Sequence, residues 1–250
     1  MGFSLRHLCL FLLLFGSVSH AQTLAHPGWR GNGIAPAAWW KHAVIVRVGT
    51  ATTFARAVAT MDRMSEAGAD TLLLPDLQPP AAASLPFDER FGTPDDLDAL
   101  LREASARHMH VVLTAPLLRL AGNSGEVRFW IARGIAGFDV GTVQPFEMDT
   151  LALLRSAVDR LPGQRLLLAH TSVPVVFHGG LTLQVVQANV RPDAGAVPAV
   201  VDLGDGAVLP SLTNAQLPMV DASVLDTEAG RERVRRMLAQ RGSTHRPRAR

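Results

Sequence analysis

The alternation of short apolar runs with helical segments is the sequence feature that most constrains how this chain folds. Apolar runs lie at Ala43–Val48, Asp70–Pro75, Met109–Pro116, Ala136–Thr142 and Arg165–Ala169, separated by segments with helical patterning. Strands that alternate with helices form parallel βα units. No dinucleotide-binding glycine motif accompanies them. The pattern therefore predicts an α/β protein, either a TIM-type (β/α) barrel or an open doubly wound sheet.

The predicted helices carry their own end signals. In FGTPDDLDALLREASARH, Thr93 is a favoured N-cap and Pro94 takes the first helical position, with acidic residues in the first turn. The spacing of apolar residues predicts further helices over Thr52–Ala67, Glu126–Arg133, Met148–Leu161 and Thr227–Gln240. Between Thr171 and the last helix there are only short extended runs broken by Gly, Pro and Asp, which indicates an irregular, β-rich region.

The N-terminal residues 1–21 have the pattern of a secretory signal peptide, with one arginine, the apolar run Leu8–Phe15 and small residues up to Ala21. Residues 22–36, rich in Gly, Pro and Ala, form a predicted lead-in segment. The apolar run is shorter than the roughly 20 residues of a membrane-spanning helix. We therefore expect cleavage, a secreted or periplasmic protein, and no membrane span afterwards. Cys9, the only cysteine, lies inside the signal, which excludes disulfides in the mature chain.

Charge patterning gives little support for nucleic acid as a partner. The formal net charge is only +2, although Arg231 to Arg250 contain eight arginines and one acid. A solvated helix end explains these charges. His108 and His110 flank Met109, but no carboxylate or cysteine stands near them in the sequence, so we interpret them as surface histidines and expect no metal site. Nothing in the chain indicates a cofactor.

Four segments follow one another between Trp39 and Val143: WWKHAVIVRV, EAGADTLLLPDLQPP, FDERFGTPDDLDALLREASARHMHVVL and FWIARGIAGFDVGTV. In order and spacing they resemble the catalytic barrel of the alpha-amylase family, glycoside hydrolase family 13. The resemblance implies an alpha-amylase-like (β/α) barrel over residues 37–181 and a C-terminal region over residues 182–250 that ends in a basic helix.

The resemblance also implies where the catalytic residues of such an enzyme would stand, and this chain has other residues there. At the third strand, Thr114 takes the place of an aspartate, Leu118 that of an asparagine that helps to hold calcium, and Arg119 that of a histidine. At the fourth strand, Asp139 takes the place of an arginine and Gly141 that of the nucleophile. On a regular strand, Asp139 would lie about 6.6 Å below the vacant site, at ~3.3 Å per residue.

Two registers are open for the rest of the barrel. If QRLLLAHTS is the fifth strand, His170 takes the place of the general acid. In the other register, TSVPVVFHGG resembles the run near the eighth strand, while QLPMVDAS and the helix RERVRRMLAQR follow the barrel. The shortness of the chain favours the second register, in which the barrel is incomplete.

Retaining glycoside hydrolysis needs two carboxyl groups about 5 Å apart. Because the resemblance places none at the expected positions, it favours an exported, catalytically inactive protein, a pseudoenzyme or binding scaffold with a carbohydrate or protein partner. The ectodomain of the heavy subunits of heteromeric amino-acid transporters, an amylase-like barrel without the catalytic set, is a formal parallel. Two alternatives stay open. One is a glycosidase with relocated carboxylates, for which Asp139 and Asp76 are the spare acids. The other is non-hydrolytic carbohydrate binding, for which Trp39, Trp40 and His170 are further candidates.

Overall fold

The structure is a computed structural model that describes residues 39–78, 88–172, 182–187, 199–204, 212 and 216–243. All of these residues belong to one compact unit, Ala37–Arg250. The expected signal peptide (residues 1–21) and lead-in segment (residues 22–36) lie outside the described residues.

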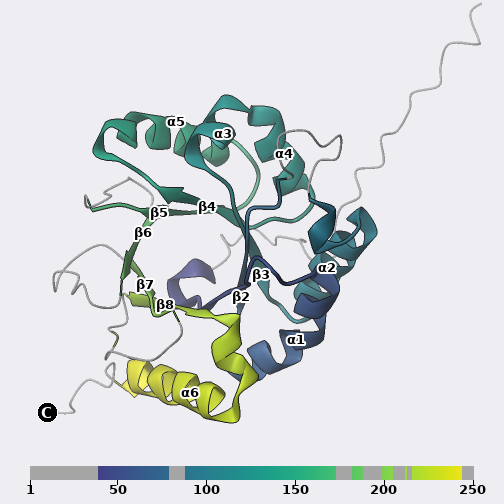
Figure 1. The fold of residues 1–250 in the computed structure, drawn as a ribbon. Helices are drawn as coiled ribbons and strands as arrows, with labels where there is room; N and C mark the ends of the chain where they lie inside the picture. The colour runs from purple at the N-terminus through teal and green to yellow at the C-terminus, as the bar shows by residue number, and fades with distance from the viewer. Residues whose placement is uncertain are drawn as a thin grey trace, which may run out of the picture. The chain divides into compact units, whose positions relative to one another are not determined.

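Eight parallel strands form a closed barrel in chain order, with β8 paired to β1 (Figure 1). The strands are β1 (Ile45–Arg47), β2 (Thr71–Leu74), β3 (His110–Thr114), β4 (Gly137–Thr142), β5 (Leu166–His170), β6 (Thr182–Gln187), β7 (Ala199–Asp202) and β8 (Gln216–Asp221). The predicted TIM-type barrel is therefore confirmed, and the open doubly wound sheet is excluded.

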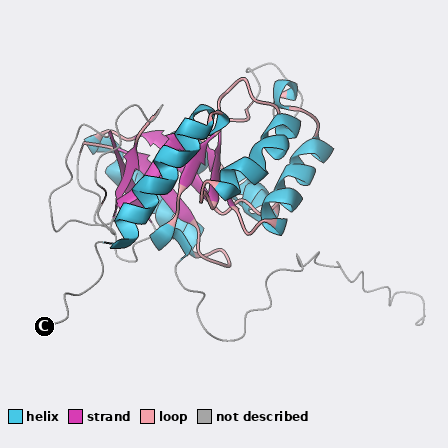
Figure 2. Ribbon diagram, turned by 90° about the horizontal axis from the view of Figure 1, so that it is seen from below, coloured by secondary structure: helices cyan, strands magenta, loops and turns pink. Residues whose placement is uncertain are grey.

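Among the described residues, helices lie outside the strands on the part of the barrel away from β6 and β7 (Figures 1 and 2). They are α1 (Phe54–Glu66), α2 (Pro94–Ala106), α3 (Leu117–Gly122), α4 (Ser124–Ala132), α5 (Met148–Asp159) and α6 (Glu228–Ser243), with short 3-10 turns η1 (Trp39–His42), η2 (Glu89–Phe91), η3 (Pro145–Glu147) and η4 (Ala222–Asp226). Thr93 and Asp96 form the capping box that starts α2, with Pro94 in its first turn. Among the described residues, no helix is long and apolar enough to cross a membrane.

The core has two layers because side chains alternate between the two faces of each strand. Inward-facing residues such as Ile45, Leu73 and Val112 fill the barrel. Their neighbours along the strands, such as Val46 and Leu72, pack between the sheet and the helices. The two layers leave room for polar groups only at the ends of the barrel.

The incomplete-barrel register is wrong. QLPMVD, which that register placed after the barrel, is its eighth strand, whereas TSVPVVFHGG lies outside the described residues from residue 173 on. The runs from residue 182 onward supply β6, β7 and β8, so no boundary at residue 181 separates the barrel from a β-rich region. These runs are short, and among the described residues no helix separates them, so periodicity gave no βα signal. The full-barrel register, with His170 at the end of β5, is the one that the chain adopts.

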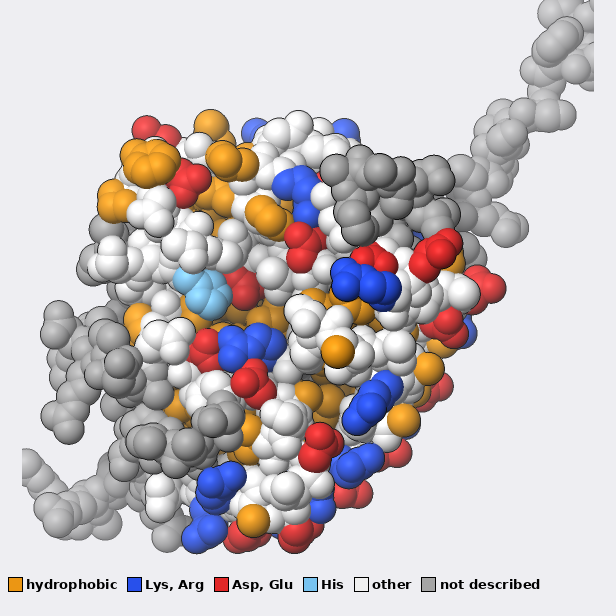
Figure 3. Space-filling model, in the orientation of Figure 1, with side chains coloured by type: hydrophobic (Ala, Val, Ile, Leu, Met, Phe, Trp, Pro, Cys, Tyr) orange, Lys and Arg blue, Asp and Glu red, His pale blue; other side chains and the backbone are white. Residues whose placement is uncertain are grey.

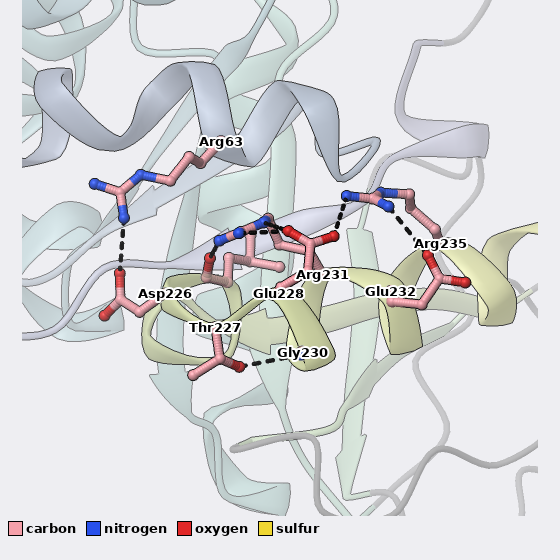
Figure 4. A network of polar contacts seen from close by, with 9 residues as sticks. Arg63, Asp226, Thr227, Glu228, Gly230, Arg231, Glu232 and Arg235 are labelled. Carbon is pink, nitrogen blue, oxygen red and sulfur yellow. Dashed lines mark hydrogen bonds and ion pairs between the residues drawn. The ribbon is translucent and has the colours of Figure 1, made fainter.

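The arginines of α6 are largely paired with acids of the same helix. Arg231 and Arg235 contact Glu228 at 2.6 and 3.1 Å, and Arg235 also contacts Glu232 at 3.0 Å (Figure 4). These pairs lie at the protein surface, where each contributes at most about 1 kcal/mol. The solvated-helix interpretation fits these pairs but not Arg241 in the last turn, which is buried and donates to the carbonyl oxygen of Lys41 at 3.3 Å.

Trp39 and Trp40 lie at the N-terminal end of the barrel, because η1 runs directly into β1. Trp40 is buried with the inward-facing residues, and Trp39 stacks on His110, the first residue of β3, with 3.8 Å between ring centroids. Active sites of such barrels form at the opposite, C-terminal end. The two tryptophans therefore pack the barrel and are not placed to bind a ligand there. His108 is exposed, as expected, whereas His110 is half-buried.

Stability should depend on the titration of His110. Burial, with a smaller contribution from the charge of Arg165, lowers the pKa of His110 to about 4. The unfolded chain, in which a histidine has a pKa of about 6.5, then binds more protons between these values, so stability falls as pH falls from about 6.5 to 4. We expect the free energy of unfolding of the wild type to drop by about 2 kcal/mol more than that of His110→Phe over this range. Urea titrations at several pH values measure the difference, and parallel curves would contradict the assignment.

Candidate functional site at the barrel mouth

Polar side chains take the last inward-facing position of seven of the eight strands. The alternation that fills the interior with apolar residues places these side chains at the C-terminal mouth of the barrel. They are Arg47 of β1, Thr114 of β3, Asp139 of β4, His170 of β5, Gln187 of β6, Asp202 of β7 and Asp221 of β8. We call this set the polar ring. Figure 3 shows basic, acidic and histidine side chains gathered at the centre of the barrel face.

Arg47 holds one side of the polar ring together. Its guanidinium group donates to Asp202 at 2.8 Å and to Asp221 at 2.7 Å. Asp202 is almost fully buried and also accepts from the backbone N–H of Gly204 at 3.0 Å and, weakly, from Gln187 at 3.4 Å. Burial acts to lower the pKa of Arg47, but the hydrogen bonds and charges of the two aspartates outweigh it and raise that pKa. Arg47 is therefore a permanent cation whose charge is already matched.

Asp139 and His170 occupy another side of the polar ring, on adjacent strands. His170 Nε2 lies 3.1 Å from Asp139 Oδ2, and their side chains are 27% and 7% exposed. Burial acts to lower the pKa of His170, but the hydrogen bond to Asp139 and the charges of Asp139 and Asp202 outweigh it and raise that pKa. Arg47 opposes this rise more weakly. Asp139 is therefore not an isolated spare acid but is bonded to a histidine.

The end of β4 departs from a regular strand. Its pairing with β5 shifts between Asp139 and Thr142, and Gly141 has a φ of +71°. The backbone N–H of Gly141 turns back to Asp139 Oδ1 at 3.0 Å. The regular-strand spacing expected between Asp139 and the vacant position therefore does not apply. Apart from its two chain neighbours, a Cβ atom at Gly141 would meet none of the described residues within 4 Å, so this position is open within the described part of the barrel.

A pocket of about 290 Å³ opens beside the polar ring, between the segments that follow β2, β3 and β4. Its lining combines Thr114 and Gly141 with the acidic Asp76 and Glu147 and the exposed Leu118. Thr114, Leu118 and Gly141, three of the positions that the resemblance singled out, thus meet at one pocket. A cavity of about 370 Å³ is lined by Gln78 and by residues of α4 and the turn before it, including Glu126.

Arg119 and Asp76 form an ion pair at the edge of the 290 Å³ pocket, whose lining includes Asp76. The guanidinium group of Arg119, on α3, donates to both oxygens of Asp76 at 2.9 Å and lies 3.0 Å from Glu126 on α4. Asp76, the second spare acid of the sequence, is therefore engaged by an arginine. Leu118, the neighbour of Arg119 on α3, is 64% exposed.

Arg47, Gln187, Asp202 and Asp221 were missed by the sequence analysis. Asp202 closes a local turn as well, since its Oδ1 accepts from the Gly204 N–H at 3.0 Å. The available signal was a polar residue at the end of an apolar run, as in AVVD, QLPMVD and IVR. Among the described residues, no group of three or more His, Cys, Asp or Glu side chains is arranged to hold a metal ion.

Comparisons with known proteins give only a partial structural likeness. No family profile and no curated protein matches the chain. Among solved structures, trehalulose synthase MutB from Pseudomonas mesoacidophila MX-45 matches with 12% identity and a TM-score of 0.43. Isomaltulose synthase PalI from Klebsiella sp. LX3 matches with 11% identity and a TM-score of 0.41. Each match covers 54% of this chain and 45% of the other, so the chain spans less than half of these enzymes. A likeness of this extent decides neither the family nor the activity.

Proposed function

We propose that the protein is an exported alpha-amylase-like barrel that does not hydrolyse glycosides and serves as a binding scaffold. The observation that carries this proposal is the end of β4, where Gly141 leaves open space and Asp139 is bonded to His170. Retaining hydrolysis needs one carboxylate that attacks the sugar and one carboxyl group that protonates the leaving oxygen. Glycine, threonine and histidine at the ends of β4, β3 and β5 provide neither.

The remaining carboxylates of the polar ring support the same proposal. Asp202 and Asp221 both contact Arg47, and Asp202 accepts two further hydrogen bonds. Either carboxylate would have to leave this arginine to attack a sugar. Catalytic groups must be positioned to within about an ångström, so such a rearrangement is incompatible with efficient hydrolysis.

Exposed apolar side chains beside the mouth support a binding role. Phe146 on η3, Leu153 on α5 and Leu118 on α3 are 83%, 70% and 64% exposed. Figure 3 shows hydrophobic side chains gathered at the upper left of the barrel face. In the same orientation, Figure 1 labels α3 and α5 there. Exposed apolar groups rimmed by polar residues are typical of interaction sites. A protein or carbohydrate partner would therefore contact this corner and the adjacent pocket.

We expect the purified protein to release no p-nitrophenol from aryl α-glucosides, and no reducing sugar from α-glucans, above a buffer blank. The physical reason is the absence of an attacking carboxylate at Gly141 and of a carboxylic acid at His170. Asp139→Asn is the control, since Asp139 is the nearest spare acid. Turnover by the wild type that disappears in Asp139→Asn would establish relocated carboxylates and contradict the proposal.

A further inference from the structure

The Asp139–His170 contact has the geometry of a prepared acid–base pair. The two residues end neighbouring strands, and Asp139 is 5% exposed as a whole residue. One carboxylate oxygen is held by the Gly141 N–H at 3.0 Å while the other contacts His170 Nε2 at 3.1 Å. The carboxylate is therefore fixed at both oxygens. A histidine bonded to such a carboxylate has a fixed ring orientation, which general acid–base catalysis requires.

The contact also fixes the tautomer of neutral His170. A carboxylate only accepts hydrogen bonds, so Nε2 carries the proton and Nδ1 has the free electron pair. Nδ1 has no hydrogen-bond partner within the part of the chain that the structure describes. With 27% of its side chain exposed at the mouth, His170 can receive a proton from a bound molecule.

We propose that Asp139 and His170 form a general acid–base site that hydrolyses an uncharged carboxylic ester at the barrel mouth. His170 Nδ1 takes a proton from water as the water oxygen bonds to the ester carbonyl carbon. The carbon–oxygen bond to the leaving group then breaks, and the proton on Nδ1 passes to the leaving oxygen or to solvent. The products are one carboxylic acid and one alcohol, and no redox step is involved. His170 is the catalytic residue and Asp139 the positioning residue.

An ester suits this site better than a glycoside. Water attacks an ester carbonyl with one general base, whereas glycoside hydrolysis requires a second carboxyl group across the sugar. The charge of the polar ring favours an uncharged ester over an anionic one. The polar ring contains three aspartates, Asp139, Asp202 and Asp221, and one arginine, Arg47. Because Arg47 is already bonded to Asp202 and Asp221, it has no positive charge left to attract an anionic substrate.

The test is hydrolysis of p-nitrophenyl acetate by the full chain, followed as p-nitrophenolate release between pH 5 and 8. The rate should rise with pH as His170 loses its proton, and His170→Gln should lower it about 100-fold, the usual contribution of a general base. His108→Gln is the matched control. His108 is exposed at the opposite end of the barrel, and its replacement should leave the rate unchanged.

Asp139→Asn tests the role of the pair rather than of the histidine alone. Asp139 acts to raise the pKa of His170, so the midpoint of the pH profile should move to lower pH in this variant. A purely structural role of Asp139 would change the melting temperature but not that midpoint. A rate two- to three-fold lower in deuterated water would identify general-base attack by water rather than direct attack by the imidazole.

An unchanged rate in folded His170→Gln, or an unchanged midpoint in Asp139→Asn, would overturn the proposal. If His170→Gln fails to fold, the pH dependence of the wild-type hydrolysis rate serves as the test instead. A rate that does not follow a single group with a pKa above that of free histidine would then refute the assignment. The ester and glycoside assays are independent, so either proposal can fail while the other stands.

Discussion

Replacement of Gly230 by alanine is expected to lower the free energy of unfolding by about 3 kcal/mol, at the upper end of typical overpacking costs. Gly230 lies in the first turn of α6, where its N–H donates to Thr227 Oγ1 at 3.1 Å (Figure 4). A Cβ atom at this position would stand 1.7 Å from the carbonyl oxygen of Val224. The contact is with backbone, so no side-chain rotation relieves it and α6 must shift away from η4.

Urea unfolding followed by circular dichroism measures this effect, and Gly122→Ala is the matched control. Gly122 is the last residue of α3, and a Cβ atom there meets nothing within 4 Å. Alanine is the better helix former, so this control should be neutral or stabilising by up to about 1 kcal/mol. Equal stability of Gly230→Ala and the wild type would show that α6 does not start as described.

Replacement of Arg47 by methionine should destabilise the barrel by about 3 kcal/mol, at the lower end of the range for a broken buried ion pair. Methionine keeps much of the side-chain length but removes the charge. Asp202, with a side chain only 6% exposed, would then be a buried anion whose partners among the described residues are an N–H and a weak amide contact. Asp221, with 34% of its side chain exposed, stays hydrated and adds little to the loss.

Two further variants separate the buried charge from a general loss of packing. Arg47→Met combined with Asp202→Asn should recover most of the stability, because an amide leaves no unpaired charge. Asp221→Asn alone should cost at most about 1 kcal/mol, as expected for a partly exposed pair. A double variant as unstable as Arg47→Met would contradict this account of the polar ring.

The barrel could be predicted from sequence where strands and helices alternate with strong end signals. Thr93 and Pro94 marked the start of α2 correctly. The helix α3 was missed because its six residues are too few for a periodic pattern and no side chain caps its start. The strands β6 to β8 were recognised only as extended runs, because periodicity cannot show that such runs pair into one sheet.

The candidate site was harder to predict because its members are far apart in the chain. His170 and Asp139 were each singled out, but their hydrogen bond depends on the register between β4 and β5. Arg47 meets Asp202 and Asp221 only because the barrel closes. No local pattern encodes closure, so a charged residue at the end of one strand gave no sign of its partner. The left-handed turn at Gly141 was likewise hidden, because a glycine in a strand-like run is compatible with both geometries.

The contact between Arg47 and Asp221 also sets an order of events during synthesis. These residues are 174 positions apart and join the first strand to the last. While the chain emerges from the ribosome, β1 has an unpaired edge until β8 has been made. Unpaired edges can associate with other chains, and closing so long a loop is slow. Barrel closure therefore cannot precede the synthesis of β8, and newly made chains should depend on chaperones until β8 pairs with β1.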